Sequence, residues 1–114
     1  MVKIYHNPRC SKSREVLTLL RERGIEPTVI EYLNTPLNID ELRELFDAAQ
    51  LSVRAAMRTK EKEYQELGLA DERLSDDELL AAIAAHPRLM NRPFVVTEKG
   101  ARLCRPTELV EEIL

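Results

Sequence analysis

The chain opens with a short run in which apolar and polar residues alternate, and a longer run follows in which apolar residues recur every three or four positions. Val2–His6 has the alternation typical of a strand, and Asn7-Pro8 ends it. We therefore expect a helix after this break, ending before Gly24, with Ser11 or Ser13 as its N-cap. The apolar stripe of this helix consists of Val16, Leu17, Leu19 and Leu20.

A second apolar segment, Pro27–Tyr32, is rich in β-branched residues and predicts another strand. Two strands joined by a helix form a βαβ unit. The right-handed crossover of such units places the two strands parallel in one sheet. The N-terminal part of the chain therefore predicts the beginning of an α/β fold.

The middle of the chain, about residues 38–87, has helical periodicity. Asp40–Ala49 predicts a helix with one apolar face, and Ser52–Leu67 predicts a more polar and interrupted helical segment. Ser75 and Glu78 have the spacing of a capping box that opens another helix. We interpret the whole region as a helical insertion.

Two short strands and a closing helix complete the pattern. Phe94–Thr97 and Ala101–Cys104 predict strands joined by a tight turn at Glu98-Lys99-Gly100, and Pro106 fits the first turn of a final helix. A βαβ unit followed by a ββα unit around a mixed four-stranded sheet is the thioredoxin-like arrangement. The predicted fold class is therefore α/β and thioredoxin-like, with the helical insertion between the two halves.

Length and charge narrow the possible functions. With 114 residues the chain fits one domain, residues 1–114, around one core. Its 17 basic and 20 acidic side chains give a net charge of −3, which provides no overall attraction to nucleic acid or to an anionic membrane. We take the charged run Lys60–Glu63 as a solvated helical face. No apolar stretch suits a transmembrane helix and no signal peptide is recognisable, so we expect a cytoplasmic protein.

Cys10 is the main candidate for chemistry because it lies between a predicted strand and the start of a helix. The thiolate is the nucleophilic form of cysteine, and a free thiol with a pKa of about 8.5 is mostly protonated at neutral pH. Unpaired N–H groups at a helix N-terminus stabilise the anion, and Arg9, Lys12 and Arg14 add positive charge nearby. We predict a nucleophilic thiol at Cys10; the alternative is a buried and inert apolar side chain.

The second cysteine, Cys104, falls in a predicted strand, and we assign it a packing role. A disulfide between Cys104 and Cys10 is not expected, because such bonds are rare in reducing compartments. The two cysteines and two histidines lack the spacing of a zinc site. We therefore predict no metal and no bound cofactor.

Several separated segments resemble one family in the same order over essentially the whole chain. These segments are His6-Asn7-Pro8-Arg9-Cys10 with Ser13-Arg14, Met57-Arg58 before Glu66-Leu67-Gly68-Leu69, His86-Pro87 with Asn91-Arg92-Pro93, and Leu103-Cys104-Arg105-Pro106. They resemble the glutaredoxin-coupled arsenate reductases of the ArsC family. The resemblance implies a thioredoxin-like fold, reduction of arsenate to arsenite, glutathione as co-substrate and glutaredoxin as partner.

The resemblance also implies a mechanism with one protein thiol. Cys10 attacks arsenic and displaces an oxygen as water, glutathione attacks the adduct, and glutaredoxin clears the mixed disulfide. Ser13 stands where a Cys-x-x-Cys enzyme carries its second cysteine. His6 is in the family position that polarises the cysteine loop through hydrogen bonds with Ser13. We expect the protein to act as a monomer.

Three arginines are implied as ligands of the oxyanion. Arg58, Arg92 and Arg105 correspond to the family arginines, and each is expected to reach the sulfur of Cys10 from a different segment. A planar guanidinium group neutralises a tetrahedral oxyanion and binds two of its oxygens at once, which lysine does less well. The resemblance further implies a cis peptide bond before Pro93.

The loop around Cys10 departs from the arsenate-resistance members, which carry a small residue before the cysteine and glycine and threonine after it. Here these positions are Arg9, Ser11 and Lys12, as in the YfgD-like branch. Two other functions are therefore kept as alternatives: a general glutathione-dependent thiol oxidoreductase, and a non-enzymatic redox or transcription regulator of the same fold. Regulators that sense redox state commonly carry a Cys-x-x-Cys switch, and Ser13 argues against that mode.

Overall fold

One mixed four-stranded sheet, in the order β2-β1-β3-β4, organises the computed structural model, which describes residues 1–114. β1 (Lys3–Tyr5) and β2 (Thr28–Ile30) run parallel, as the crossover rule predicts. β3 (Phe94–Thr97) is antiparallel to β1 and to β4 (Gly100–Leu103). This topology confirms the α/β, thioredoxin-like fold class, although β1 and β2 are shorter than the apolar runs that predicted them.

Apolar side chains cover both faces of the sheet. On one face, α1 (Ser11–Glu22) and the C-terminal helix η3 (Thr107–Ile113) pack over a cluster of Ile4, Val16, Leu20, Val95, Cys104, Val110 and Ile113. The other face contributes Phe94 and Ala101 to a larger cluster that extends into the helical region. Neighbouring residues of β3 therefore point into different clusters, as the two-residue period of a strand requires.

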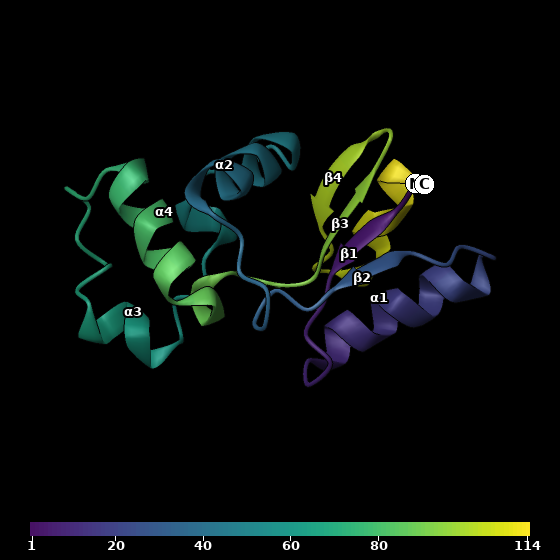
Figure 1. Cartoon of the computed structure of the whole chain (residues 1–114), viewed down its shortest axis with the longest axis horizontal. Coiled ribbons are helices and arrows are strands. Elements are labelled where there is room, and N and C mark those ends of the chain that lie inside the picture. The colour runs from purple at the N-terminus through teal and green to yellow at the C-terminus, as the bar shows by residue number, and fades with distance from the viewer.

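The helical region occupies one end of the molecule, and the sheet with α1 occupies the other (Figure 1). It contains α2 (Ile39–Ala48), α3 (Lys62–Glu66) and α4 (Asp76–Ala85) and two short 3₁₀ helices, η1 (Arg54–Ala56) and η2 (Pro87–Leu89). The prediction of a helical Ser52–Leu67 is only partly right, because the chain straightens after η1. There Met57 pairs with Met90 in an isolated antiparallel bridge.

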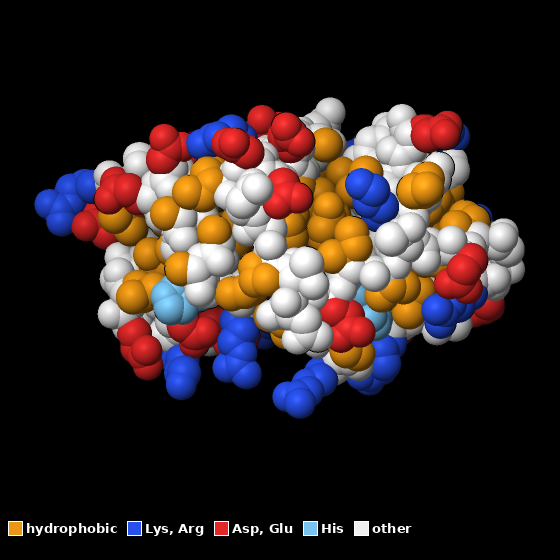
Figure 2. All heavy atoms as spheres, in the orientation of Figure 1, with side chains coloured by type: hydrophobic (Ala, Val, Ile, Leu, Met, Phe, Trp, Pro, Cys, Tyr) orange, Lys and Arg blue, Asp and Glu red, His pale blue; other side chains and the backbone are white.

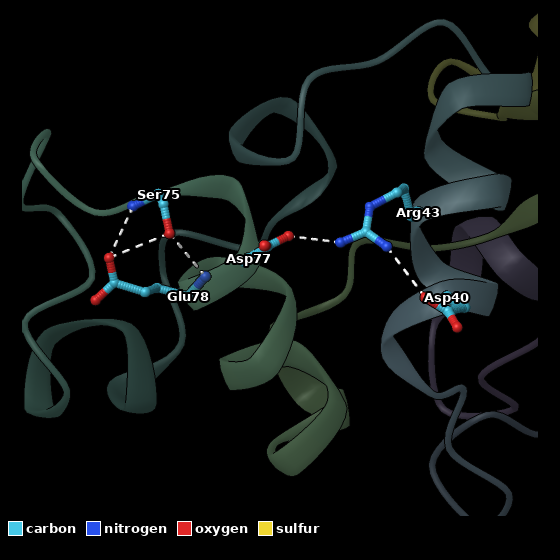
Figure 3. Close-up of polar contacts among 5 residues, drawn as sticks. All are labelled: Asp40, Arg43, Ser75, Asp77 and Glu78. Carbon is cyan, nitrogen blue, oxygen red and sulfur yellow. Dashed lines mark hydrogen bonds and ion pairs between the residues drawn. The ribbon is translucent and has the colours of Figure 1, made fainter.

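Side-chain caps fix the starts of α2 and α4. The predicted capping box is confirmed: the Glu78 N–H donates to Ser75 Oγ at 3.2 Å, and the Ser75 N–H donates to Glu78 Oε1 at 3.1 Å (Figure 3). A second capping box at Asn38 was not predicted. Arg43 of α2 pairs with Asp77 in the first turn of α4, which ties the two helices together at the surface (Figure 3).

Two predictions about helix ends are wrong. Neither Ser11 nor Ser13 caps α1; Cys10 is the N-cap residue and its side chain makes no capping bond. Ser13 is instead buried in the first turn, where its hydroxyl bonds to groups of the preceding loop. The final helix is a 3₁₀ helix that follows Pro106 rather than containing it in its first turn.

The surface carries mixed charge. Acidic and basic side chains are interspersed on the face shown in Figure 2, and several basic side chains project along its lower edge. The large apolar side chains that are exposed, Met1, Val29 and Leu67, belong to different segments of the chain. None of the helices combines the length and the apolar character that crossing a membrane requires.

Candidate active site

Cys10 closes the loop between β1 and α1, which lies between the sheet and the helical end of the molecule (Figure 1). The loop is held by its own backbone: the Cys10 N–H donates to the Asn7 carbonyl at 3.0 Å, and the Arg9 N–H donates to Asn7 Oδ1 at 3.0 Å. Cys10 is 8% exposed and is therefore nearly covered. The loop presents one thiol in a fixed position.

The pKa of the Cys10 thiol is lower than its ordinary value. Burial raises this pKa, but the backbone N–H of Ser13, the guanidinium group of Arg92 and the backbone N–H of Lys12 together lower it by more. Both N–H groups belong to the first turn of α1, which has no intrahelical partners for them. The helix start thus stabilises the thiolate as the sequence predicted.

Ser13, which the sequence places where a second cysteine would stand, joins the loop to His6. Its Oγ lies 2.6 Å from His6 Nδ1 and accepts the Asn7 N–H at 3.1 Å. Since the oxygen already accepts one hydrogen bond, its own hydrogen is available to donate to Nδ1 of a neutral imidazole. This places the imidazole proton on Nε2.

His6 is 6% exposed, and its pKa is below the ordinary value. Burial is the main cause; the Glu31 carboxylate opposes it, and Arg21 and Arg14 lower the pKa further. His6 is therefore neutral at neutral pH. It influences the thiol by holding the loop in place through Ser13 and does not stabilise the thiolate as a positive charge.

Arg105 and Arg92 are the two predicted arginines beside the sulfur. Arg105 Nη1 lies 3.9 Å from Cys10 Sγ and also donates to the Arg92 carbonyl at 3.2 Å. Arg92 lowers the thiol pKa, and its Nε is buried without a hydrogen-bond partner. The peptide bond between Arg92 and Pro93 is cis, as predicted. Two cationic side chains thus converge on one thiol.

Arg58, the third predicted arginine, makes no hydrogen bond to Cys10. The Met57–Met90 bridge holds its backbone beside the segment that leads to Arg92, since the Arg58 N–H donates to the Leu89 carbonyl at 2.7 Å. Its Nε lies 3.1 Å from Glu61 Oε1, close enough for an ion pair. The angle is unsuitable for a hydrogen bond, however, and this buried Nε has no hydrogen-bond partner.

Two hollows divide the arginines between them. Residues of the thiol loop line the larger one, and the smaller one is connected to Cys10 only through Arg105. The larger, about 720 Å³, contains Arg92 together with His6, Arg9, Tyr32 and Glu61 in its lining. The smaller, about 270 Å³, is lined by Met57, Arg58, Thr59, Lys60, Asn91 and Arg105. Polar and charged side chains dominate both linings, which suits a small hydrophilic ligand.

Tyr32 is a site residue that the sequence analysis missed. It is 1% exposed, and burial raises the pKa of its phenol to about 12, although Arg92 and Asn7 act in the opposite direction. The phenol is therefore protonated at neutral pH and can donate a hydrogen bond, and Tyr32 lines the larger hollow. Tyr32 ends a predicted strand parallel to the one that leads to Cys10, and carboxyl ends of parallel strands meet at one edge of a sheet. That relation was the available signal.

Glu61 was wrongly assigned to a solvated face. Its side chain is 23% exposed, it pairs with Arg58 and it lines the larger hollow. The assignment failed because charge alternation in a sequence does not reveal whether a helix will form there. Glu61 lies just before α3 and not on its outer face.

Cys104 has the packing environment that was predicted for it. It is 0% exposed, between the sheet and the helices α1 and η3. Burial raises the pKa of its thiol to about 12, against smaller opposing effects of the Val95 N–H and Arg102. Cys104 is therefore a protonated thiol in the core.

The fold and this site define a thioredoxin-like protein with one thiol of lowered pKa beside arginines. The sequence matches the ArsC family over residues 5–113, and the chain belongs to that family. It is 54% identical over 113 residues to the arsenate reductase of Rhizobium meliloti (strain 1021), covering 99% of this chain and 81% of that protein. It is also 53% identical over 114 residues to Uncharacterized protein YfgD of Escherichia coli (strain K12), covering 99% of this chain and 96% of that protein.

A solved structure of a relative has the same fold in detail. The arsenate reductase from Vibrio cholerae superposes with a TM-score of 0.96 at 55% sequence identity, covering 99% of this chain and 97% of that one. The thioredoxin-like arrangement and the helical region are therefore both shared with that structure.

Proposed function

We propose that this protein is an arsenate reductase in which Cys10 is the nucleophile. The observation that carries the proposal is the thiol of lowered pKa beside Arg92 and Arg105. The choice of arsenate as substrate rests on relatives named arsenate reductase, which are about half identical to this protein over nearly the whole chain. The proposed substrate is thus a small tetrahedral oxyanion.

Charge is the obstacle that this reaction must overcome. Arsenate carries about two negative charges near neutral pH, so the attack of a thiolate brings one anion onto another. Guanidinium groups beside the sulfur neutralise the substrate and hold the charge that develops on its oxygens. Arg92 and Arg105 are near the thiol for this role, and Arg58 lies in the same smaller hollow as Arg105.

In the proposed reaction, the Cys10 sulfur forms a bond to arsenic and one arsenate oxygen leaves as water. The thiol of glutathione then displaces a second oxygen as water. A glutaredoxin thiolate attacks the glutathione sulfur, and the electron pair of the broken sulfur–arsenic bond reduces arsenic from the +5 to the +3 state. Water finally releases arsenite from Cys10. The two electrons are thus balanced by one disulfide between glutathione and glutaredoxin.

External reductants are favoured because the chain offers no second usable thiol. Cys104 is buried in the core with a pKa raised to about 12, and Ser13 occupies the place of a resolving cysteine. Glutathione and glutaredoxin are therefore the proposed co-substrate and partner. We further propose that the protein acts as a monomer, since its exposed large apolar side chains are scattered. The proposed location is the cytoplasm, where glutathione keeps thiols reduced.

A coupled assay tests this proposal. NADPH oxidation is followed with glutathione, glutathione reductase and glutaredoxin, with and without arsenate. We expect an arsenate-dependent rate in the wild type that is lost in Cys10→Ser and retained in Cys104→Ala. Arg105→Lys is expected to reduce kcat/KM for arsenate by about tenfold or more, because lysine cannot replace the guanidinium fork.

The same assay separates the alternatives. No arsenate-dependent rate in the folded wild type would contradict the reductase. Glutathione-dependent turnover of a mixed-disulfide substrate that is indifferent to Arg105→Lys would indicate a general thiol oxidoreductase. Capture of RNA polymerase by both the wild type and Cys10→Ser, without turnover, would indicate a regulator.

A further inference from the structure

A carboxylate pairs with one of the three arginines in a site that is otherwise suited to anions. Glu61 Oε1 lies 3.1 Å from Arg58 Nε, and the two side chains are only 23% and 25% exposed. The pairing is not well formed, because Arg58 Nε has no aligned hydrogen-bond partner. The Glu61 carboxylate thus balances the charge of Arg58, while the Arg58 Nε–H remains without a hydrogen-bond partner.

The backbone presents Glu61 to Arg58 and not to the helix that follows. Glu61 is the N-cap residue of α3, but its side chain makes no capping bond. A turn joins the two residues, in which the Glu61 N–H approaches the Arg58 carbonyl at 3.4 Å. Arg58 itself is anchored through its N–H to the Leu89 carbonyl. The Glu61 carboxylate is therefore not engaged by the helix that follows, and its partner Arg58 has an anchored backbone.

The pair stands between the two hollows. Glu61 lines the larger hollow with Arg92, and Arg58 lines the smaller one with Arg105. An oxyanion that takes a place beside Cys10 and recruits Arg58 meets the Glu61 carboxylate at the same guanidinium group. The glutamate and the substrate thus compete for the positive charge of Arg58.

We propose that Glu61 is a specificity-determining residue that holds Arg58 in the absence of substrate and sets the charge a ligand needs to recruit it. This inference rests on the proposed function, because it takes Arg58 as an oxyanion ligand. A doubly charged oxyanion displaces the carboxylate, whereas a singly charged anion does not. Glu61 acts through Arg58 and has no part in the chemistry at sulfur.

The experiment measures binding without turnover. Sulfate, a doubly charged tetrahedral oxyanion, is used to protect Cys10 from alkylation by iodoacetamide in the wild type and in Glu61→Gln. Removing the competing carboxylate is expected to lower the sulfate concentration for half-protection by about two- to fivefold, the range that corresponds to loss of one partly exposed ion pair. Protection by perchlorate, which is tetrahedral like sulfate but carries one charge, is expected to appear only in Glu61→Gln.

Two comparisons separate this role from a structural one. Glu66→Gln removes the same charge from α3 at an exposed residue that forms no ion pair, and it is expected to leave half-protection unchanged. In an Arg58→Gln background, Glu61→Gln is expected to have no further effect, because the interaction it removes is already absent.

Four results would overturn the inference. They are an absence of sulfate protection in every variant, the same half-protection concentration in Glu61→Gln as in the wild type, an equal gain in Glu66→Gln, and a gain from Glu61→Gln that persists in the Arg58→Gln background. Failure of arsenate turnover would contradict the proposed function and leave these binding results unaffected. The two proposals can therefore fail separately.

Discussion

Ser13 Oγ lies 2.6 Å from His6 Nδ1 and accepts the Asn7 N–H at 3.1 Å. Ser13, which stands at the place of a second cysteine, therefore links the start of α1 to the end of β1 and to the thiol loop through hydrogen bonds. Ser13 itself is 0% exposed, and its contact with His6 is buried. Its removal leaves buried polar groups without partners.

Ser13→Ala is expected to lower the free energy of unfolding by about 1–3 kcal/mol, the cost of leaving a buried donor or acceptor unpaired. Urea unfolding followed by circular dichroism measures the change. Ser11→Ala, in the same helical turn but exposed, is the matched control and is expected to stay within about 0.5 kcal/mol of the wild type. Equal effects of the two substitutions would contradict the role of the Ser13 hydroxyl.

The two cysteines are expected to differ sharply in reactivity. Cys10 has a lowered pKa at the site, whereas burial raises the pKa of Cys104 to about 12. Mass spectrometry after brief iodoacetamide treatment at neutral pH should find the label on Cys10 alone, and on both residues after unfolding in urea. Labelling of native Cys104 at a comparable rate would show that its burial is not maintained in solution.

Arg92 contributes to the lowered pKa of the Cys10 thiol. Arg92→Gln removes the positive charge that favours the thiolate, so the pH profile of alkylation is expected to move to higher pH and the rate at neutral pH to fall. Arg88→Gln also removes a cation from the lining of the larger hollow, but Arg88 is not among the groups that lower the Cys10 pKa, so this variant is the matched control. An unmoved profile in Arg92→Gln, or an equal shift in both variants, would contradict the assignment.

His6 gives the protein an acid-sensitive stability. Burial lowers its pKa in the folded state below the ordinary 6.5, so the unfolded chain takes up a proton first as the pH falls. The stabilisation is fully present above pH 6.5 and is lost progressively below it. Urea unfolding at about pH 7.5 and about pH 5.5 is expected to show this loss.

A pair of variants identifies the histidine responsible. His6→Asn retains a side chain that can bond to Ser13, and it is expected to lose the part of the pH dependence that begins near 6.5. His86 is the C-cap residue of α4 and makes no contact with Ser13, and His86→Asn is expected to keep this pH dependence. The same slope in all three proteins would assign the acid sensitivity to other groups.

The spacing of apolar residues along the sequence was sufficient to predict the helices and strands that bury one face. β1, β3, β4, α1, α2 and α4 follow from it, because apolar side chains at strand or helix spacing end up in the two clusters that cover the sheet. β2 follows from its β-branched residues alone, because Thr28 and Val29 are exposed and none of its residues belongs to either cluster. The capping box of Ser75 follows from two residues three apart. The position of Cys10 at the start of a helix was likewise local information.

The features that escaped prediction depend on contacts between distant segments. Ser13 does not cap α1, because its hydroxyl forms hydrogen bonds with the His6 side chain and the Asn7 N–H. Glu61 becomes a site residue because the Met57–Met90 bridge brings Arg58 beside the chain that leads to Arg92. The resemblance named all three arginines, but only the structure separates Arg58 from the two that lie near the sulfur.

The Met57–Met90 bridge also has a consequence for how this architecture can vary. The chain between the two methionines contains α3 and α4 and forms a loop that the bridge closes. Arg58 and Arg92 lie next to this bridge. Lengthening such a closed loop costs little conformational entropy, since the cost grows only with the logarithm of its length. Insertions in this loop at a distance from the bridge would therefore leave the spacing of Arg58 and Arg92 unchanged. This segment is the one best able to gain residues that form a new surface without disturbing the site.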